Sequence, residues 1–157
     1  MSATDGTAAG TVTLNVGASR LVSDRERVWF AGSDGQLWRS DGTALGTTLV
    51  ADVIPANVWS GIEQLTAVGE RVFFTADDGV HGDELWRSDG TAAGTRVVRD
   101  IWPGAGEGNP GDLVRLGRIF LFAAGHPNTG RELWRSNGTK DGTRLVKDIR
   151  PDGDASP

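Results

Sequence analysis

Glu84-Leu85-Trp86-Arg87-Ser88-Asp89-Gly90-Thr91 is the stretch that decides the fold, because it is one of three copies of a single phrase. The other two copies are 36–43, which begins with Gln36, and 132–139, in which Asn137 replaces the aspartate. The tryptophans of the copies are spaced by 48 residues each time (86 − 38 and 134 − 86). A period of this length is typical of repeat architectures. The sequence therefore predicts three structurally equivalent units.

Each unit divides into four short strands, as the third copy illustrates. Alternating polar and apolar residues over 112–116 indicate a half-buried strand, and the apolar run 119–124 indicates a strand buried on both faces. Strands at 132–136 and 143–149 follow. No window has the apolar period of a long helix. The same pattern predicts strands at 20–24, 27–32, 36–40 and 47–53 in the first unit and at 64–68, 71–76, 84–88 and 95–101 in the second.

A four-stranded unit that repeats every 48 residues fits one blade of a β-propeller. A β-solenoid or a linear array of hairpins is the alternative, although solenoid coils are usually shorter. We therefore expect an all-β chain of three antiparallel, four-stranded blades with an extra N-terminal strand. We divide this single repeat domain into a partial repeat with a closing strand at 1–17 and blades at 18–55, 56–103 and 104–157.

Two of the phrases, 84–91 and 132–139, resemble the bacterial repeat family known as ELWxxDGT, and 143–149 is similar to the closing strand of that family. The likeness covers nearly the whole chain, and Gln36 and Asn137 are its departures. The resemblance implies large bacterial proteins of the cell surface or of secreted type, built from propeller-like repeats. It implies no enzymatic activity. No signal peptide is visible in this segment, so we expect the signal elsewhere in the parent protein.

Charge and composition narrow the classes of partner. The net charge of −5 and the lack of a basic stripe argue against a nucleic-acid partner. The chain has no cysteine, which excludes disulfides and thiolate sites. No apolar run approaches the roughly 20 residues of a membrane helix, so we expect no membrane partner.

The six tryptophans fall into different classes. Trp38, Trp86 and Trp134 recur at one position of the repeat, which favours core packing, with each indole N–H finding one partner, over a ring of sugar-stacking platforms. Trp59 and Trp102 lie where the repeats diverge, between the fourth strand of one unit and the first strand of the next. Exposed aromatics on such loops suit ligand binding, so both are candidate binding residues. The alternative is that they anchor their loops.

The densest polar cluster lies in the second unit, and its carboxylate oxygens could hold Ca²⁺. However, the spacing matches neither an EF-hand nor an RTX-type loop, and the third unit replaces the cluster. We therefore expect a solvated turn, with no bound metal and no cofactor. The weak metal candidates are Asp77, Asp78 and Asp83, with His81 and Glu84 beside them.

An aspartate also recurs in the repeat, at Asp52, Asp100 and Asp148. Because an arginine recurs beside each repeated tryptophan, we expect a structural ladder, either of Arg–Asp ion pairs or of hydrogen bonds to the backbone. Catalysis has little support. The two histidines, His81 and His126, lie near no nucleophile motif and show no metal-ligand spacing.

These observations favour a non-enzymatic scaffold or binding module that recognises glycan or protein through its divergent loops. A purely structural, self-assembling segment is the main alternative, and a glycan-active enzyme that uses carboxylates such as Asp77 and Asp83 is the third. Three blades are fewer than the roughly 4–8 of a closed propeller. Because the strand 11–16 copies the fourth strand of a unit, we expect two copies of the chain to close a six-bladed ring as a homodimer.

Overall fold

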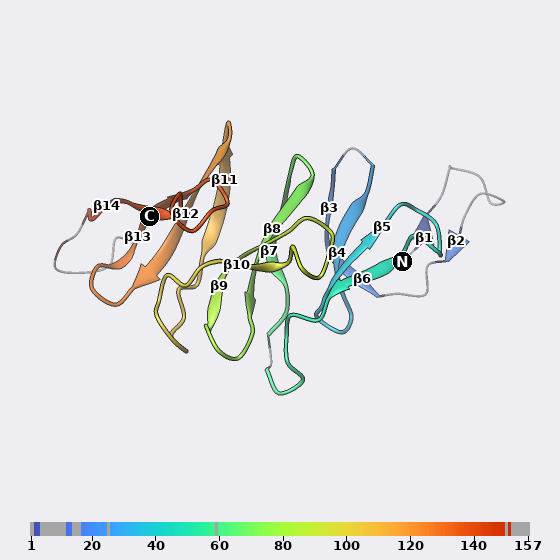
Figure 1. Cartoon of the computed structure of the whole chain (residues 1–157), viewed down its shortest axis with the longest axis horizontal. Coiled ribbons are helices and arrows are strands. Elements are labelled where there is room, and N and C mark those ends of the chain that lie inside the picture. The colour runs from blue at the N-terminus through green and yellow to red at the C-terminus, as the bar shows by residue number, and fades with distance from the viewer. Residues whose placement is uncertain are drawn as a thin grey trace.

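The computed structural model describes residues 2–3, 12–13, 17–24, 26–58, 60–149 and 151, and within these ranges the chain is all-β, without a helix. Three antiparallel sheets of four strands each follow one another along the long axis (Figure 1). The predicted all-β class and the three four-stranded units are thus confirmed. The described residues contain no helix of the length and apolarity that a membrane crossing requires.

Each large sheet is an up-and-down meander, in which strands adjacent in sequence are paired. The first sheet consists of β3 (Ala18–Ser23), β4 (Val28–Gly32), β5 (Leu37–Ser40) and β6 (Thr48–Ala51). The second consists of β7 (Glu63–Val68), β8 (Arg71–Asp77), β9 (Asp83–Ser88) and β10 (Arg96–Arg99). The third consists of β11 (Gly111–Leu116), β12 (Ile119–His126), β13 (Gly130–Ser136) and β14 (Arg144–Lys147).

The N-terminal strand pairs differently from its predicted role. Its described part, β2 (Val12–Thr13), pairs with β1 (Ser2–Ala3) in a separate two-stranded sheet rather than with a large sheet. Each large sheet already contains its own fourth strand, so the isolated chain offers this segment no vacant place. The rest of the predicted strand 11–16 lies outside the described residues.

The recurring phrase forms most of the third strand of each sheet, and its last three residues begin the turn that leads to the fourth strand. Asp89 Oδ1 accepts hydrogen bonds from the backbone N–H of Thr91 (3.0 Å) and from its hydroxyl (2.7 Å), and Thr91 Oγ1 accepts one from Gly94 N (2.9 Å). A Cβ on Gly94 would collide with the Asp89 carboxylate. Asn137 Oδ1 accepts the same two bonds from Thr139. The amide can therefore replace the aspartate without loss of the turn.

A β-bulge recurs in the first strand of each sheet, where the pairing with the second strand shifts register. One residue within each shifted segment has a positive φ, although none is glycine. Bulges bend a strand and increase its twist. The twist of the first strand is therefore a property of the repeat unit. These residues are Arg20 (52°), Gln64 (49°) and Asp112 (56°).

Two apolar cores lie between the sheets, and the second sheet contributes to both. Phe74 and Trp86 pack with the first sheet, whereas Phe73 and Leu85 pack with the third. Alternation along a strand explains why neighbouring residues serve opposite cores. The third sheet contributes Trp134 to the second core. The exposed fractions of Trp86 (8 %) and Trp134 (4 %) confirm their predicted burial.

The contacts between strands of different sheets are made mainly by the first strands. β3 lies beside β7, and β7 lies beside β11. A salt bridge joins β3 to β7 at this point, with Arg20 Nη2 2.7 Å from Glu63 Oε1. The first strands therefore form the line along which the sheets meet (Figure 1).

Candidate functional site

The residue before each Leu-Trp pair is a buried latch, a role that the sequence analysis did not assign. Gln36 Nε2 donates to Ile54 O (2.7 Å), and Gln36 Oε1 accepts from Ile54 N (3.1 Å). Glu84 Oε1 accepts from the backbone N–H groups of Ile101 (2.9 Å) and Trp102 (2.7 Å). These bonds hold the segment that leaves the fourth strand against the start of the third strand.

Burial raises the pKa of Glu84 to about 8, against the lowering effect of the hydrogen bonds from Trp102 and Ile101. Nearby Asp100 raises it further. Glu84 is therefore mainly a neutral acid at neutral pH. The first sheet has the neutral Gln36 at the same position, and its Nε2 donates to Ile54 O, whereas the buried Oε2 of Glu84 has no hydrogen-bond partner among the described residues. The latch is thus structural rather than catalytic.

The acidic hairpin of the second sheet is held by turn hydrogen bonds. Asp78 Oδ1 accepts from Val80 N (3.0 Å) and His81 N (2.8 Å), and Asp78 Oδ2 lies 2.8 Å from His81 Nδ1. Asp77 Oδ1 accepts from Gly79 N (2.7 Å). Across the described ranges, no group of three or more His, Cys, Asp or Glu side chains is arranged to hold a metal ion. The arrangement of Asp77 and Asp78 is that of a turn.

Asp83 lies opposite Asp77 in this hairpin. Burial raises the pKa of Asp83 to about 6, and the carboxylates of Glu63, Asp77 and Glu107 raise it further. Asp83 therefore takes up a proton in mildly acidic solution. Its neighbours are carboxylates and backbone groups, so the hairpin offers a proton acceptor without an adjacent nucleophile among the described residues.

The structure describes only one of the two candidate binding tryptophans. Trp59 lies outside the described residues. Trp102 is half-buried, and a Cβ on Gly106 would collide with its ring. A Cβ on Gly125 would lie 3.4 Å from Trp102 Cε3. The ring therefore lies against two glycines, one of them in β12, which is the arrangement of a loop anchor.

The three repeated tryptophans differ in their hydrogen bonds. Trp38 Nε1 donates to Asp34 Oδ2 (3.1 Å), whereas the buried Nε1 atoms of Trp86 and Trp134 have no hydrogen-bond partner within the described part of the chain. The prediction that each indole finds a partner is therefore wrong for two of them. The hairpin of the first sheet is shorter, and its tight turn brings Asp34 to the indole.

Two arginines of the second sheet bond to the backbone of the third sheet, and one of them, Arg87, is the arginine of the recurring phrase. Arg87 Nη1 donates to Gly138 O (2.6 Å), and Arg99 Nη1 donates to Thr143 O (2.8 Å). A backbone bond of the predicted kind therefore occurs between the second and third sheets, whereas the equivalent Arg39 donates to Thr48 Oγ1 of its own sheet (3.4 Å). The recurring aspartates take part in no salt bridge among the described residues, and these are Asp52, Asp100 and Asp148.

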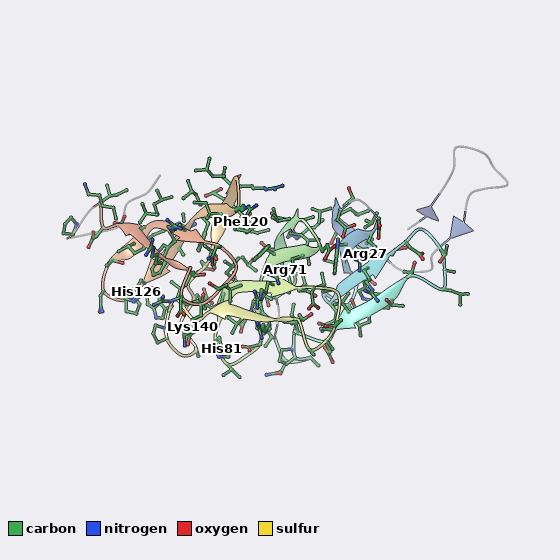
Figure 2. The ribbon with its side chains drawn as sticks, turned by 45° about the horizontal axis from the view of Figure 1, so that its top comes forward. Arg27, Arg71, His81, Phe120, His126 and Lys140 are labelled. Carbon is green, nitrogen blue, oxygen red and sulfur yellow. The ribbon has the colours of Figure 1, made fainter. Side chains whose placement is uncertain are left out.

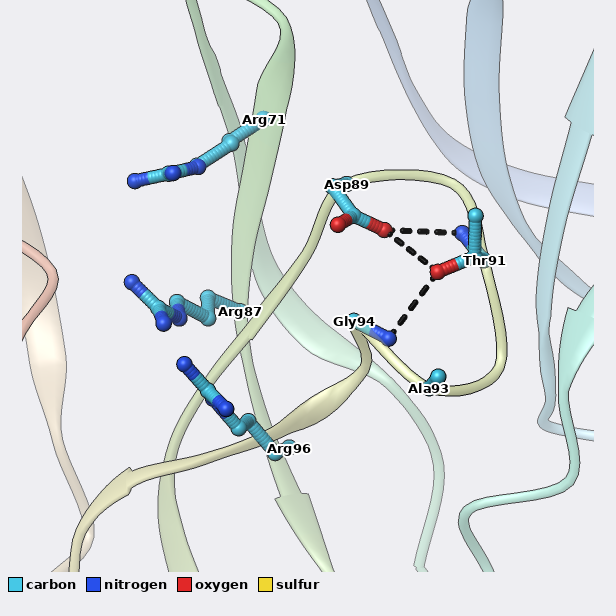
Figure 3. A pocket seen from close by; sticks show the side chains of 7 residues that line it. All are labelled: Arg71, Arg87, Asp89, Thr91, Ala93, Gly94 and Arg96. Atoms are coloured by element: carbon cyan, nitrogen blue, oxygen red, sulfur yellow. Dashed lines mark hydrogen bonds between the residues drawn. The ribbon is translucent and has the colours of Figure 1, made fainter.

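A row of three arginines crosses the second sheet, and the sequence analysis did not single it out. Arg71 begins β8, Arg87 lies in β9 and Arg96 begins β10. Arg96 lies directly opposite Arg87, and Arg71 lies diagonally across from it, so all three share the face toward the third sheet. Figure 3 shows their side chains extending side by side. The signal in the sequence is the strand register, which places these residues on one face.

The arginine row (Arg71, Arg87 and Arg96) lines a hollow of about 310 Å³ together with the turn that contains Asp89 and Thr91. Burial lowers the pKa of Arg87, and Arg96 and Arg71 lower it further. Among the described residues, no salt bridge involves the row. The hollow is therefore cationic.

A second hollow of about 490 Å³ shares Arg87 and Arg96 with the first. It also has three further basic side chains in its lining, Arg99, Lys140 and His81. Figure 2 places Lys140 and His81 on the same side of the second sheet. Basic groups thus gather along the junction of the second and third sheets, although the chain as a whole has a net charge of −5.

No family model matches the chain, and neither does any curated protein. Solved structures with a similar fold include puromycin hydrolase (TM-score 0.58, 15 % identity) and a mutant of puromycin hydrolase complexed with PGG (TM-score 0.57, 16 % identity). Both matches cover 92 % of this chain and 24 % of the neighbour, so the chain spans about a quarter of the length of these proteins. The computationally designed protein Ika8 matches over 84 % of this chain and 35 % of its own, with a TM-score of 0.46 and 17 % identity. At such identities the likeness concerns the fold alone.

Proposed function

We propose that this chain is a non-enzymatic β-propeller scaffold in which each large sheet is one blade. The third blade packs against the first blade of a second copy of the chain. The parent protein is then a bacterial surface or secreted repeat protein, as the ELWxxDGT resemblance implies. The line of contact along β3, β7 and β11 supports the blade assignment, since the first strands would surround the propeller axis. One observation carries the proposal of association, namely a difference in exposure between equivalent residues.

Each large sheet has an apolar face that points toward the position of the next sheet along the chain, which we call the outward face. This face is covered in the first two sheets and exposed in the third. Leu37 and Leu85 are both 0 % exposed, whereas the equivalent Leu133 is 37 % exposed. Ile101 is 1 % exposed, whereas the equivalent Ile149 is 55 % exposed. In both covered cases, the next sheet of the same chain packs over the face. The chain itself therefore indicates what kind of surface fits this face.

An unpaired arginine marks the same open face. Arg87 Nη1 donates to Gly138 O of the following sheet. Arg135 is the equivalent residue of the third sheet, and its Nε is buried without a hydrogen-bond partner in the described ranges. Gly42 is the counterpart of Gly138 in the first sheet and has a similar φ, 92° against 81°. In a second copy, the carbonyl of Gly42 is the acceptor that the repeat assigns to Arg135.

The first sheet exposes the complementary side. Leu65 packs toward the first sheet and is 9 % exposed, whereas the equivalent Leu21 has no four-stranded sheet before it among the described residues and is 53 % exposed. Docking of the third blade onto the first blade of a second copy would cover both faces. Two such contacts close a ring of six blades, within the roughly 4–8 of known propellers and with the two-fold symmetry that is commonest among homo-oligomers.

Sedimentation equilibrium over a range of concentrations tests the association. We expect the mass to rise to twice the chain mass of 16.6 kDa. Leu133→Asp places a carboxylate in the open face and should leave the chain monomeric, because an unpaired charge would be buried. Leu45→Asp is the matched control. Leu45 is 95 % exposed in the turn between β5 and β6, so this variant should still dimerise.

A mixing experiment tests the head-to-tail geometry. Leu21→Asp alters only the first sheet and should also give a monomer. An equimolar mixture of Leu21→Asp and Leu133→Asp should recover a dimer. The third sheet of the Leu21→Asp chain and the first sheet of the Leu133→Asp chain are both unaltered, so these two sheets can still form one contact. A wild-type chain that stays monomeric at all concentrations contradicts the proposal. A dimer that Leu21→Asp leaves intact would show that the third blade pairs with itself.

Binding of glycan or protein by the same scaffold is the second candidate function. The observation that favours it is the arginine row, rather than Trp102, whose ring lies against glycines. A glycan-active enzyme has less support, because the carboxylate of Asp77 serves the turn at Gly79. Titration of the chain with neutral and acidic oligosaccharides separates a binding module from a purely structural scaffold.

A further inference from the structure

We propose that the arginine row binds an acidic oligosaccharide, whose carboxylate or sulfate groups pair with the guanidinium groups of Arg71, Arg87 and Arg96. The site lies within one chain, so the inference does not rest on the association of two copies. The inference deepens the second candidate function, the binding of glycan or protein, by naming the class of ligand and the residues that bind it.

The geometry of the row suits a ligand with several oxyanions. The three arginines come from three neighbouring strands, which lie roughly 4.8 Å apart. Their guanidinium groups extend in one direction from the sheet (Figure 3). Guanidinium groups pair with planar or tetrahedral oxyanions through two parallel hydrogen bonds. Arg71 and Arg96 are exposed, so a ligand in solution can reach them.

The row is a property of the second sheet rather than of the repeat. In the first sheet, Arg27 has a carboxylate partner, with Nε 3.9 Å from Asp24 Oδ2, and Thr48 replaces the third arginine. In the third sheet, Ile119 replaces the first arginine. The shared blade architecture therefore does not require all three positive charges.

The three positive charges of the row are balanced only in part by Asp89, whose charge interacts with Arg87 and Arg71. Like charges directly opposite each other on paired strands destabilise a sheet, and Arg87 and Arg96 are such a pair. No carboxylate among the described residues forms a salt bridge with the row. A bound anion would relieve this repulsion and gain three charge-assisted contacts.

The turn beside the row favours a sugar over a polyphosphate. Hydrogen bonds from Thr91 hold the pKa of Asp89 below its usual value, so Asp89 stays ionised. Both of those bonds end on Oδ1, and no hydrogen bond from a described residue ends on Oδ2, which is therefore able to accept one from a hydroxyl group. The sugar-phosphate backbone of single-stranded DNA has no free hydroxyl group within the chain to donate to this oxygen. An acidic sugar supplies both oxyanions and hydroxyl donors.

The length of the basic surface indicates an oligomer rather than a single ion. The hollows of about 310 Å³ and about 490 Å³ lie next to each other, because Arg87 and Arg96 line both. Arg99 and Lys140 extend the positive lining beyond the row, and Asp100 is the one carboxylate among the described residues that lines the second hollow. Successive acidic sugar units would occupy the two neighbouring hollows at the junction of the second and third sheets.

Isothermal titration calorimetry of the full chain tests the site with four probes. These are a galacturonate tetramer, sulfated maltotetraose, neutral maltotetraose and a thymidylate single strand. We expect at least one of the two acidic sugars to bind, with affinity that falls as salt rises. Binding of the galacturonate alone identifies carboxylate as the preferred oxyanion, and binding of the sulfated sugar alone identifies sulfate. Neutral maltotetraose should not bind.

Arg71→Gln and Arg96→Gln test the residues of the row. Both side chains are exposed, so these variants should fold like the wild type, which circular dichroism checks. Each should weaken binding of the acidic sugar about tenfold, since each removes one hydrogen-bonded charge pair. Arg144→Gln is the matched control. It is an exposed arginine at the equivalent position of Arg96 in the third sheet, and its loss should leave the affinity unchanged.

Four outcomes would overturn the proposal. They are the absence of binding by both acidic sugars at low salt, equal binding of neutral maltotetraose, tighter or equal binding of the thymidylate strand, and a loss in Arg144→Gln as large as that in Arg96→Gln. None of these results bears on the mass measured by sedimentation, so the failure of this proposal and the failure of the association remain separable.

Discussion

The outward faces of the second and third sheets have nearly the same sequence and opposite surroundings. Leu85 and Leu133 stand in the same phrase, yet the first is 0 % and the second 37 % exposed. Val98 and Val146 show the same contrast, 5 % against 47 %. The repeat thus specifies an apolar face in every unit, and only the presence of a following unit turns that face into core.

This comparison shows which part of the stability is local and which comes from neighbours. The turn bonds of the recurring phrase are made within a unit and are the same in all three sheets. The burial of the apolar face is supplied by the next sheet. In repeat architectures, stability is a sum of such unit and interface contributions. Substitutions at equivalent positions can therefore separate the two contributions.

The largest contrast should come from truncating the two leucines. Leu85→Ala should lower the free energy of unfolding by about 2–5 kcal/mol, because it opens a cavity in a core. Leu133→Ala removes the same atoms from a partly exposed side chain and should cost less than about 1 kcal/mol in the monomer. Urea unfolding followed by tryptophan fluorescence at low protein concentration measures both. Equal losses would mean that the two faces are equally covered.

The second contrast concerns Glu84 and its counterpart Gln36. The pKa of Glu84 is raised from 4.5 to about 8 in the folded chain, so the folded state keeps a proton that the unfolded state releases. Stability should therefore fall as pH rises from about 4.5 to about 8. Glu84→Gln should remove this fall and stabilise the chain by about 2 kcal/mol near pH 7.5, roughly half the value of the full shift.

Gln36→Glu is the reciprocal control for this prediction. It places an acid in the equivalent latch and should introduce a new loss of stability toward alkaline pH. Asp83, with a pKa raised from 3.8 to about 6, adds a separate fall at lower pH that both variants retain. Urea midpoints measured between pH 5 and pH 8 decide the matter. Parallel profiles for the wild type and Glu84→Gln would contradict a protonated latch.

A smaller effect should be independent of the neighbouring sheet. A Cβ on Gly94 would collide with Asp89, and a Cβ on Gly142 would collide with Asn137 in the same way. Gly94→Ala and Gly142→Ala should therefore each cost roughly 1–2 kcal/mol, because the turn must shift. Thermal or urea unfolding of the two variants measures the cost. A much larger loss for one of them would show that its turn depends on contacts outside the unit.

The smallest effect should come from the salt bridge between the first two sheets. The side chains of Arg20 and Glu63 are 46 % and 53 % exposed, so solvent screens their attraction. The pair should contribute about 0.5 kcal/mol or less. A double-mutant cycle with Arg20→Ala and Glu63→Ala measures this coupling. A coupling well above that value would make the contact of β3 with β7 depend on charge rather than on packing.

Much of the fold could be predicted from the sequence because its determinants are local. The strands and turns follow from alternation, from apolar runs and from a phrase whose hydrogen bonds span a few residues. The latch could not be predicted in this way. Glu84 bonds to Ile101, which is 17 residues away, and only the paired strands bring the two together.

The arginine row also could not be predicted from the spacing of residues in the sequence. Arg71, Arg87 and Arg96 are unevenly spaced, and their common face depends on the register of two strand pairs. Trp102 lies on a divergent loop, which made it a candidate binding residue. Its ring lies against Gly106 and Gly125, and the sequence does not show that these glycines are its neighbours. Tertiary neighbours decide which divergent residue is available to a ligand.

The central claim is that the apolar face of the third sheet is an interface for a second copy of the chain. The chain has no cysteine, so Leu133→Cys introduces a single thiol on that face, and Leu45→Cys introduces one on an exposed turn. The rate of alkylation, measured against protein concentration, reports directly whether the face becomes covered. The account predicts that labelling at position 133 slows as concentration rises while labelling at position 45 stays constant. A rate at position 133 that does not change with concentration would contradict it.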